Sequence, residues 1–217
     1  MKTRLATLFL AAAALACKVD NNASIQVVAL CAPPAETCGT EGGCDAYLAS
    51  QPFLYLEGGT NYLELFVEMT NQLADNADPS AGRLNTNDAY LEKYRLTYRS
   101  AFFNYADYDY PASGILRAGS TSAPIVRLIP ETISAPLSAA MAAAGATTGL
   151  VEVGLTITGH YASGDSFEVG GVTFPVDVHN DAFPGYTCPN ATDTITYVCP
   201  NTAQTAAYTC TAAPAAP

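Results

Sequence analysis

The central part of the chain alternates apolar and polar residues with a period of two, which is the pattern of β-strands that bury one face. Residues 61–69 and 93–99 follow this pattern, and a shorter alternation over residues 125–129 ends at Pro130. The apolar positions of the two longer segments are Leu63, Leu65, Val67, Met69, Tyr94, Leu96 and Tyr98. These segments therefore predict half-buried antiparallel strands.

The clearest hairpin pattern lies in the second half of the chain. Residues 151–157 alternate apolar and polar, a Ser-Gly-Asp turn follows at 163–165, and residues 172–178 alternate back. The expected inward positions are Val151, Val153, Leu155, Ile157, Val172, Phe174, Val176 and Val178. The adjacent glycines at 170 and 171 indicate a β-bulge within the returning strand.

Charged residues occupy the polar faces of the first two predicted strands. Glu64 and Glu68 lie on one strand, and Arg95 and Arg99 lie on the other. If these strands are neighbours, the four side chains form cross-strand ion pairs worth about 0.2–1 kcal/mol each. The sequence thus favours a structural role for these charges over a basic ligand site.

One segment departs from the strand pattern and predicts a short helix. Ser134 can cap its beginning, Pro136 falls in its first turn, the following residues are rich in alanine, and Gly145 suits its end. About seven strands, one crossover helix and frequent glycine and proline turns predict an immunoglobulin-like antiparallel β-sandwich. After about 16 residues are removed from its start, the chain has the length of one such domain.

The first residues have the composition of an export signal. Lys2 and Arg4 precede an apolar run that is too short to span a bilayer, and Cys17 follows the small residues Ala14 and Ala16. Cleavage before Cys17 fits either ordinary signal peptidase or the lipobox of a bacterial lipoprotein. The lipoprotein reading is favoured because seven cysteines leave one unpaired, and lipid on Cys17 would account for it.

The other six cysteines fall into two clusters, one at each end of the mature chain. The clusters consist of Cys31, Cys38, Cys44, Cys188, Cys199 and Cys210. No Cys-x-x-Cys pair suggests zinc, so we expect disulfides, although the sequence leaves fifteen pairings open. Each cluster holds an odd number of cysteines. If all six pair, at least one bridge therefore joins the two ends of the chain.

The C-terminal cluster contains a short repeat. The triplet Tyr-x-Cys occurs three times, beginning at Tyr186, Tyr197 and Tyr208. In the first two triplets the cysteine begins a Cys-Pro-Asn unit, at 188 and at 199. These units suggest turns between extended segments that are fixed by disulfides. A binding face built from the three tyrosines is the alternative interpretation.

The mature chain is strongly acidic. Removal of Lys2 and Arg4 leaves seven basic and twenty acidic residues, so the mature net charge is about −13. A protein of this charge repels nucleic acid, and we expect no nucleic-acid partner. The acidity is also the simplest route to solubility for an exported domain.

Motifs of common enzymes are missing from the sequence, and we expect no catalytic activity. There is no Gly-x-Ser-x-Gly, His-Glu-x-x-His, dinucleotide-binding or P-loop motif. Its two histidines, His160 and His179, follow apolar strand patterns and are interpreted as strand-end or loop residues. No catalytic residue is therefore assigned.

Two polar regions are candidate binding loops. The first has oxygen-bearing side chains that suit calcium, at Asp75, Asp78, Asn85, Asn87 and Asp88. Ordinary turns in which Asp and Asn bond the local backbone explain the same residues, and no other cofactor is expected. The second region, residues 105–110, is an expected loop that combines tyrosines and aspartates. Such a loop can bind a glycan or a protein, and packing at one end of the sandwich explains it equally well.

Several longer motifs resemble one group of proteins. They are Cys-Asp-Ala-Tyr at 44–47, Leu-Glu-Leu-Phe-Val-Glu at 63–68, Gly-Arg-Leu-Asn-Thr-Asn-Asp-Ala at 82–89, and the segment 167–178. Together they resemble uncharacterised bacterial outer-membrane lipoproteins with a single β-sandwich domain. The resemblance covers nearly the whole mature chain. It implies export, lipidation and a sandwich, and it implies no catalytic residue.

These observations divide the chain into four parts. Residues 1–16 form a signal peptide, 17–50 a lipid-attachment site and Cys-rich loop, 51–187 the β-sandwich, and 188–217 a Cys-repeat segment with an Ala/Pro tail. We expect a noncatalytic lipoprotein anchored to the outer membrane by an N-terminal lipid, or otherwise secreted or periplasmic. Its expected partner is an envelope protein or a glycan. A calcium- or glycan-binding adhesin-like module is the alternative.

Overall fold

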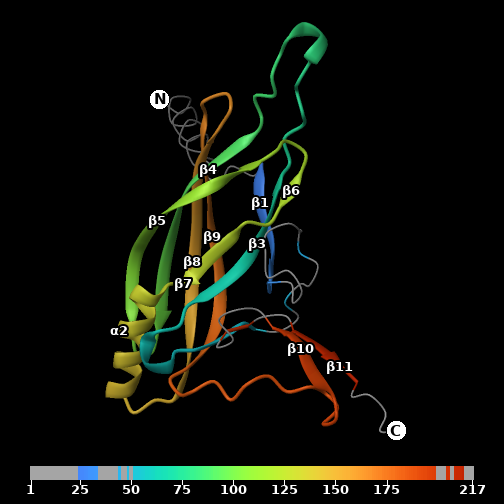
Figure 1. Ribbon diagram of the computed structural model, residues 1–217. Helices are drawn as coiled ribbons and strands as arrows, with labels where there is room; N and C mark the ends of the chain where they lie inside the picture. The colour runs from blue at the N-terminus through green and yellow to red at the C-terminus, as the bar shows by residue number, and fades with distance from the viewer. Residues whose placement is uncertain are drawn as a thin grey trace, which may run out of the picture.

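The computed structural model describes residues 24–33, 44, 48, 51–198, 204–205 and 208–212. Two β-sheets pack face to face in these residues and form a tall sandwich (Figure 1). The first sheet has, in spatial order, β2 (Phe53–Tyr55), β9 (Ser166–His179), β8 (Thr148–Tyr161), β4 (Ala89–Ser100) and β5 (Asn104–Leu116). The second has β3 (Leu63–Asn71) with β1 (Ile25–Cys31) on one side and both β6 (Thr121–Ser122) and β7 (Ile125–Ile129) on the other.

The remaining elements are short. Two 3-10 helices, η1 and η2, lie before and after β3, at Glu57–Gly59 and Pro79–Ala81. One α-helix, α2 (Glu131–Ala143), connects β7 to β8 and therefore crosses from one sheet to the other. A separate hairpin of β10 (Thr194–Val198) and β11 (Tyr208–Thr211) follows the sandwich.

The predicted fold class, an immunoglobulin-like antiparallel β-sandwich with one crossover helix, is confirmed. The apolar positions predicted to face inward on β3, β4 and β8 are buried together in one hydrophobic core, which both sheets contribute to. Strand pairs are antiparallel except β2 and β9, which run parallel. One strand, β1, lies before residue 51, where the sequence placed the start of the sandwich domain.

The β8–β9 hairpin also agrees with the sequence prediction. Leu155 pairs with Val172 and Ile157 pairs with Val169, so two glycines on β9 oppose the single residue Thr156 on β8. The second of these glycines has φ +76°, a backbone conformation that side chains other than glycine rarely adopt. The expected bulge at residues 170–171 is therefore present.

The expected pairing of segments 61–69 and 93–99 is wrong. β3 and β4 lie in different sheets, and Arg95 bonds Asp109 of β5 rather than a glutamate of β3. Glu64 instead bonds Arg127 of β7. Alternation along one strand shows which face is buried, but it carries no information about which strand lies alongside, and this explains the error.

The helix begins four residues earlier than expected, because its N-cap residue is Pro130 and not Ser134. Pro130 precedes its first turn, and Ser134, the expected cap, is buried inside the helix, where its hydroxyl has no hydrogen-bond partner among the described residues. The end agrees with the prediction, because Gly145 follows the helix with φ +67°. A proline before the first turn starts this helix, and its fixed φ is compatible with that position.

Residues 105–110 form part of β5 and not the expected loop. Tyr108 pairs with Leu96, and Tyr110 pairs with Tyr94, on the neighbouring strand β4. Asp107 has φ +59° and lies where the register shifts between β4 and β5. Aspartate is uncommon in strands, and the extensive pairing with β4 overrides this local preference.

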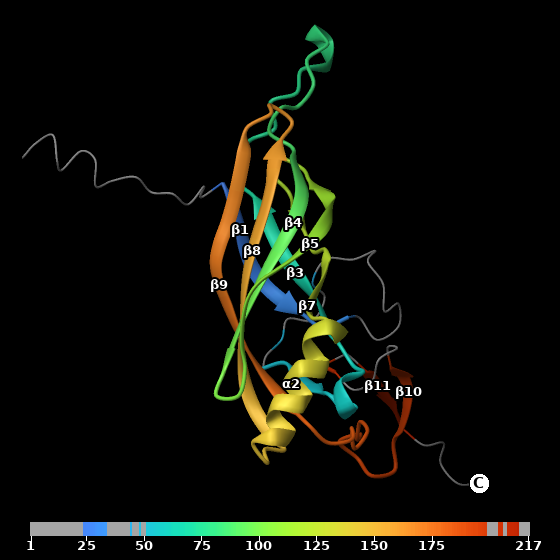
Figure 2. The same cartoon turned by 90° about the vertical axis from the view of Figure 1, so that its left-hand side faces the viewer.

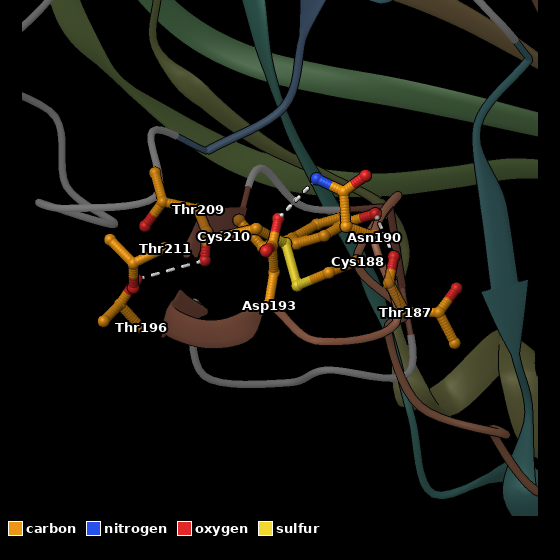
Figure 3. The surroundings of a disulfide bond; sticks show 9 residues. Thr187, Cys188, Asn190, Asp193, Thr196, Thr209, Cys210 and Thr211 are labelled. Atoms are coloured by element: carbon orange, nitrogen blue, oxygen red, sulfur yellow. Dashed lines mark hydrogen bonds between the residues drawn. A yellow bond between two sulfur atoms is a disulfide. The ribbon is translucent and has the colours of Figure 1, made fainter. Parts of the chain in front are cut away.

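Both terminal segments contain disulfides, as predicted. Cys31 bonds Cys44, and Cys188 bonds Cys210, which lies on β11 (Figure 3). Each of these bridges lies within one cysteine cluster. The leader, the lipidation candidate Cys17, and the cysteines at 38 and 199 lie outside the described residues. The predicted bridge between the two clusters therefore stays a prediction.

The C-terminal segment also contacts the sandwich directly. The Thr205 N–H donates to the Phe53 carbonyl oxygen at 2.9 Å, and the Glu64 N–H donates to the side-chain oxygen of Gln204 at 2.6 Å. Gln204 is buried. Hydrogen bonds thus attach the chain after β10 to β2 and β3.

The two ends of the sandwich differ in what they carry. Residues 72–88 project beyond one end, whereas α2 and the β10–β11 hairpin lie at the opposite end (Figure 2). No helix in the described part of the chain is long and apolar enough to cross a membrane.

Candidate functional site

A cleft of about 370 Å³ opens between the edge strands of the two sheets. β5 is the edge of one sheet and β7 is an edge of the other, so the sandwich is open along this side. β3 and the start of α2 complete the lining. The lining residues are Glu64, Tyr108, Tyr110, Ile125, Arg127, Pro130, Glu131 and Thr132.

Arg127 is the ionic centre of the cleft. Its Nε and Nη2 atoms lie 2.7 and 2.6 Å from Oε1 of Glu64, and its Nη1 lies 3.1 Å from Oε2 of Glu131. The guanidinium carbon also lies 4.1 Å from the centre of the Tyr62 ring. These contacts use all three guanidinium nitrogens and hold the side chain in one orientation.

The charges around Arg127 set its protonation. Burial lowers the pKa of the guanidinium, but the hydrogen bond and charge of Glu64, with the charge of Glu131, outweigh burial, so the pKa is raised above its ordinary value. The cation is therefore permanent. Two carboxylates and one guanidinium give this group a net charge of −1.

Tyrosines from β5 form the aromatic wall. The Tyr110 hydroxyl donates to the carbonyl oxygen of Arg127 at 3.3 Å, and burial raises the pKa of Tyr110 well above its usual range. The ring centre of Tyr108 lies 6.1 Å from that of Tyr110. Tyr110 is therefore uncharged and fixed by its bond to β7.

This arrangement is suited to binding a hydroxylated ligand. Tyrosine faces pack against the apolar face of a sugar-like ring, and fixed carboxylates accept hydrogen bonds from hydroxyl groups. The net negative charge of the ionic group disfavours anionic ligands. Neither histidine nor cysteine is among the lining residues.

Both histidines lie away from this cleft. His160 is near the end of β8, where its Nδ1 lies 2.9 Å from the Glu92 carboxylate and its ring stacks on Tyr90. His179 is the last residue of β9, and its ring stacks on Tyr55 with 4.3 Å between ring centres. The expectation that both are strand-end residues is confirmed.

The calcium candidates lie in the projecting segment 72–88, where several accept local hydrogen bonds. Asp75 accepts from the Ala77 N–H, and Asn85 accepts from the Asn87 N–H. Asp78 accepts from the Ser80 hydroxyl, which is the main cause of its lowered pKa. The bonds made by Asp75 and Asn85 are those of Asx turns.

Asp88 and Asn87 are also held by neighbouring groups. Oδ1 of Asp88 accepts from Nδ2 of Asn85 and from the Ala118 N–H, and Nδ2 of Asn87 donates to the carbonyl oxygen of Ala74. Within the described ranges, no three His, Cys, Asp or Glu side chains gather as a metal site. Calcium binding by these residues stays a prediction.

Two of the repeated tyrosines near the C-terminus, Tyr186 and Tyr208, make packing contacts. Tyr186 stacks on Tyr208 with 4.7 Å between ring centres, and a series of ring contacts continues through Phe183 to Tyr55 of β2. The Tyr186 hydroxyl donates to the Gln204 carbonyl oxygen, and burial raises its pKa to about 12. Ring contacts and hydroxyl bonds made within the protein favour packing over a binding face at Tyr186 and Tyr208.

Sequence reasoning missed the cleft. Its residues come from four elements, and Arg127 seemed to be the single polar position within a short apolar strand. Glu131 follows Arg127 by only four residues, but Arg127 lies on a strand and Glu131 begins the helix, so the helical i,i+4 rule does not predict their contact. The contribution of β5 could not be found without the strand pairing.

Comparison with known proteins identifies no family. No protein-family model matches the chain, and no curated protein matches it. Among solved structures, the chain is similar to the solution structure of AT1g01470 from Arabidopsis thaliana. The identity is 13% and the TM-score 0.36, over 60% of this chain and 78% of that one. A likeness this weak supports no functional argument.

Proposed function

We propose that the protein is a noncatalytic interaction module of the cell envelope, held at the outer membrane by lipid on Cys17. Two disulfides support maturation in an oxidising compartment. They use four cysteines, and the two at 38 and 199 can pair, so Cys17 is the odd one. An export leader immediately before it supports its acylation.

The cleft between β5 and β7 is the observation that carries the interaction role. It is concave, it is walled by tyrosines, and its ionic group is fixed before any ligand arrives. Preorganised groups of this kind favour binding because little side-chain entropy is lost when the ligand docks. We infer that a partner of the envelope docks here.

Detergent partition of the full chain tests the anchor. The wild-type protein is expected in the detergent-rich phase, and Cys17→Ser is expected in the aqueous phase because it lacks the acylated thiol. Lys18→Ala is the matched control, since it changes the next residue and keeps Cys17. Equal partition of Cys17→Ser and wild type would contradict the proposal.

The second candidate is a glycan-binding adhesin-like module, and the composition of the cleft favours it. Tyrosine faces beside fixed carboxylates are the groups expected to recognise a sugar. Binding to an array of bacterial glycans is expected for the wild type and reduced about fivefold or more in Tyr108→Ala, because aromatic contacts are worth about 1 kcal/mol or more. Calcium belongs to the same candidate and would raise the melting temperature above that measured in chelator.

A control for the glycan experiment lies on the same strand. Tyr105 is exposed on β5, stacks on Phe103 and is not among the cleft-lining residues. Tyr105→Ala is therefore expected to retain glycan binding. The glycan candidate fails when no glycan binds or when both tyrosine variants lose binding equally.

A further inference from the structure

Residues 72–88, which connect β3 to β4, form a projecting loop that extends past the end of the sandwich (Figures 1 and 2). The loop has η2 at its tip, between Asp78 and Gly82. Neither sheet contains its tip. A projection of this length exposes a large surface and serves no evident packing role at its tip.

Cross-links between its two arms give the loop a defined shape. Asn76 Nδ2 donates to the Thr86 hydroxyl at 2.7 Å, and the Thr86 N–H donates back to Asn76 Oδ1 at 2.8 Å. Nearer the tip, the backbones of Asp78 and Arg83 exchange two hydrogen bonds of 2.9 Å. The loop therefore loses little conformational entropy when its tip contacts another surface.

The tip carries exposed apolar side chains, and its two charged residues, Asp78 and Arg83, pair with each other. Leu84 is 84% exposed, the largest exposed fraction among the large hydrophobic side chains described as exposed. Ala77, Pro79 and Ala81 are also exposed. The only ion pair at the tip joins Arg83 to Asp78 at 4.0 Å.

The base of the loop lies beside the point where the described N-terminal segment begins. The Gln72 N–H donates to the Ser24 carbonyl oxygen at 2.7 Å, and Ile25 pairs with Asn71. The Ser24 hydroxyl is also hydrogen-bonded to Tyr161, at the end of β8. The chain from Cys17 therefore enters the sandwich at the same end from which the loop projects.

The reach of the two segments is similar. Six residues separate Cys17 from Ser24, so lipid on Cys17 lies at most about 25 Å from Ser24. The chain from Asn71 to Pro79 at the loop tip spans at most about 29 Å. An anchored lipid and the loop tip can thus meet the same membrane plane.

We propose that the projecting loop is a second membrane contact, with Leu84 inserted into the bilayer that holds the lipid on Cys17. This inference rests on the proposed anchor. The loop has three aspartates, Asp75, Asp78 and Asp88, and one cation, Arg83, so its charge does not attract it to anionic lipid. The contact therefore depends on apolar side chains. It orients the sandwich with α2 and the β10–β11 hairpin facing away from the membrane, and the cleft along its side.

Tryptophan fluorescence tests this contact without interference, because the chain contains no tryptophan. Leu84→Trp puts a single reporter next to the tip. Leu150→Trp is the matched control, since Leu150 is also an exposed leucine but lies on the first residues of β8, at the opposite end of the sandwich. The acylated variants are inserted into vesicles of phosphatidylcholine and phosphatidylethanolamine, with and without brominated acyl chains.

The inference predicts a blue shift and bromine quenching for the tryptophan at 84, and neither for the tryptophan at 150. Leu84→Asp is expected to leave the vesicles about tenfold faster than Leu150→Asp, because it loses the burial of one leucine side chain. An acylated Leu84→Trp protein with the spectrum it has in buffer overturns the inference and leaves the anchor intact. An intact mass without acyl groups removes the anchor, and the inference with it.

Discussion

At the scale of single residues, Arg127 determines the geometry of the cleft. Its guanidinium joins Glu64 of β3 to Glu131 of α2, and its backbone carbonyl accepts the Tyr110 hydroxyl of β5. One side chain and its backbone therefore connect strands of both sheets and the helix. Removing the cation leaves two carboxylates close together without a counter-charge.

Replacement of Arg127 should therefore destabilise the protein measurably. Arg127→Met is expected to lower the free energy of unfolding in urea by about 1–2 kcal/mol, a modest value because the side chain is partly exposed. Arg83→Met, which removes a longer and more exposed pair with Asp78, is the control and should cost close to nothing. Equal losses of unfolding free energy in the two variants would contradict a stabilising role for the Arg127 ion pairs.

Buried tyrosines make the protein sensitive to alkaline pH. Burial raises the pKa of Tyr94 to about 12 and raises that of Tyr98 further, whereas a tyrosine in the unfolded chain has its ordinary value near 10. Above pH 10 the unfolded state releases these protons first, so the free energy of unfolding falls as the pH rises toward 12. Urea titrations between pH 8 and 11 should show this fall, and Tyr94→Phe should reduce it. A slope unchanged in that variant would refute the assignment.

At the scale of secondary-structure elements, the sequence predicted what lies along one strand and missed what lies between strands. Alternation identified β3, β4, β7 and the β8–β9 hairpin with its bulge, because these patterns are local. It could not pair Glu64 with Arg127, since that contact depends on the position of β7 beside β3. Residues 105–110 were misread for the same reason, because their pairing with β4 is not visible in their own composition.

The packing of α2 depends on a close approach that the sequence also concealed. A Cβ atom on Gly59 would lie 2.4 Å from the Cα of Ala135, and Gly59 has φ +88°. The neighbouring Gly58 has φ +75°, but a Cβ there meets nothing within 4 Å. Gly58 is therefore required only by its left-handed backbone, whereas Gly59 is required both by its backbone and by the lack of space for a side chain.

Alanine at these two positions should have different effects. Gly58→Ala is expected to cost about 1–2 kcal/mol of stability, from the left-handed backbone alone. Gly59→Ala should cost about 1–3 kcal/mol more, because η1 must move away from α2. Thermal or urea unfolding measures both, and equal losses would contradict the close contact between η1 and α2.

At the scale of the whole molecule, the two described disulfides change the prediction of an end-to-end bridge. Cys31–Cys44 and Cys188–Cys210 each close a loop within one cluster. Only the cysteines at 38 and 199 remain after the lipidation candidate is set aside. The odd number of cysteines in each cluster allowed many bridges between the ends of the chain. With the two described disulfides formed, the predicted bridge is the one between the cysteines at 38 and 199.

Trypsin can test this bridge directly. The six cysteines after Cys17 fall into two tryptic peptides, residues 19–83 and 128–217. Each peptide contains one of the two described disulfides, so only a bridge between the cysteines at 38 and 199 can link the peptides. We expect them to stay linked under non-reducing conditions and to separate after reduction. Two unlinked peptides from native protein, with alkylatable thiols at 38 and 199, would disprove the bridge.

The intact mass of the native protein from the membrane fraction tests the central claim most directly. The account predicts a chain that starts at Cys17, carries acyl groups there, and has three oxidised cysteine pairs. A mass equal to that of an unacylated chain, or one in which every cysteine is a free thiol, would contradict a lipid-anchored sandwich that matures in an oxidising compartment.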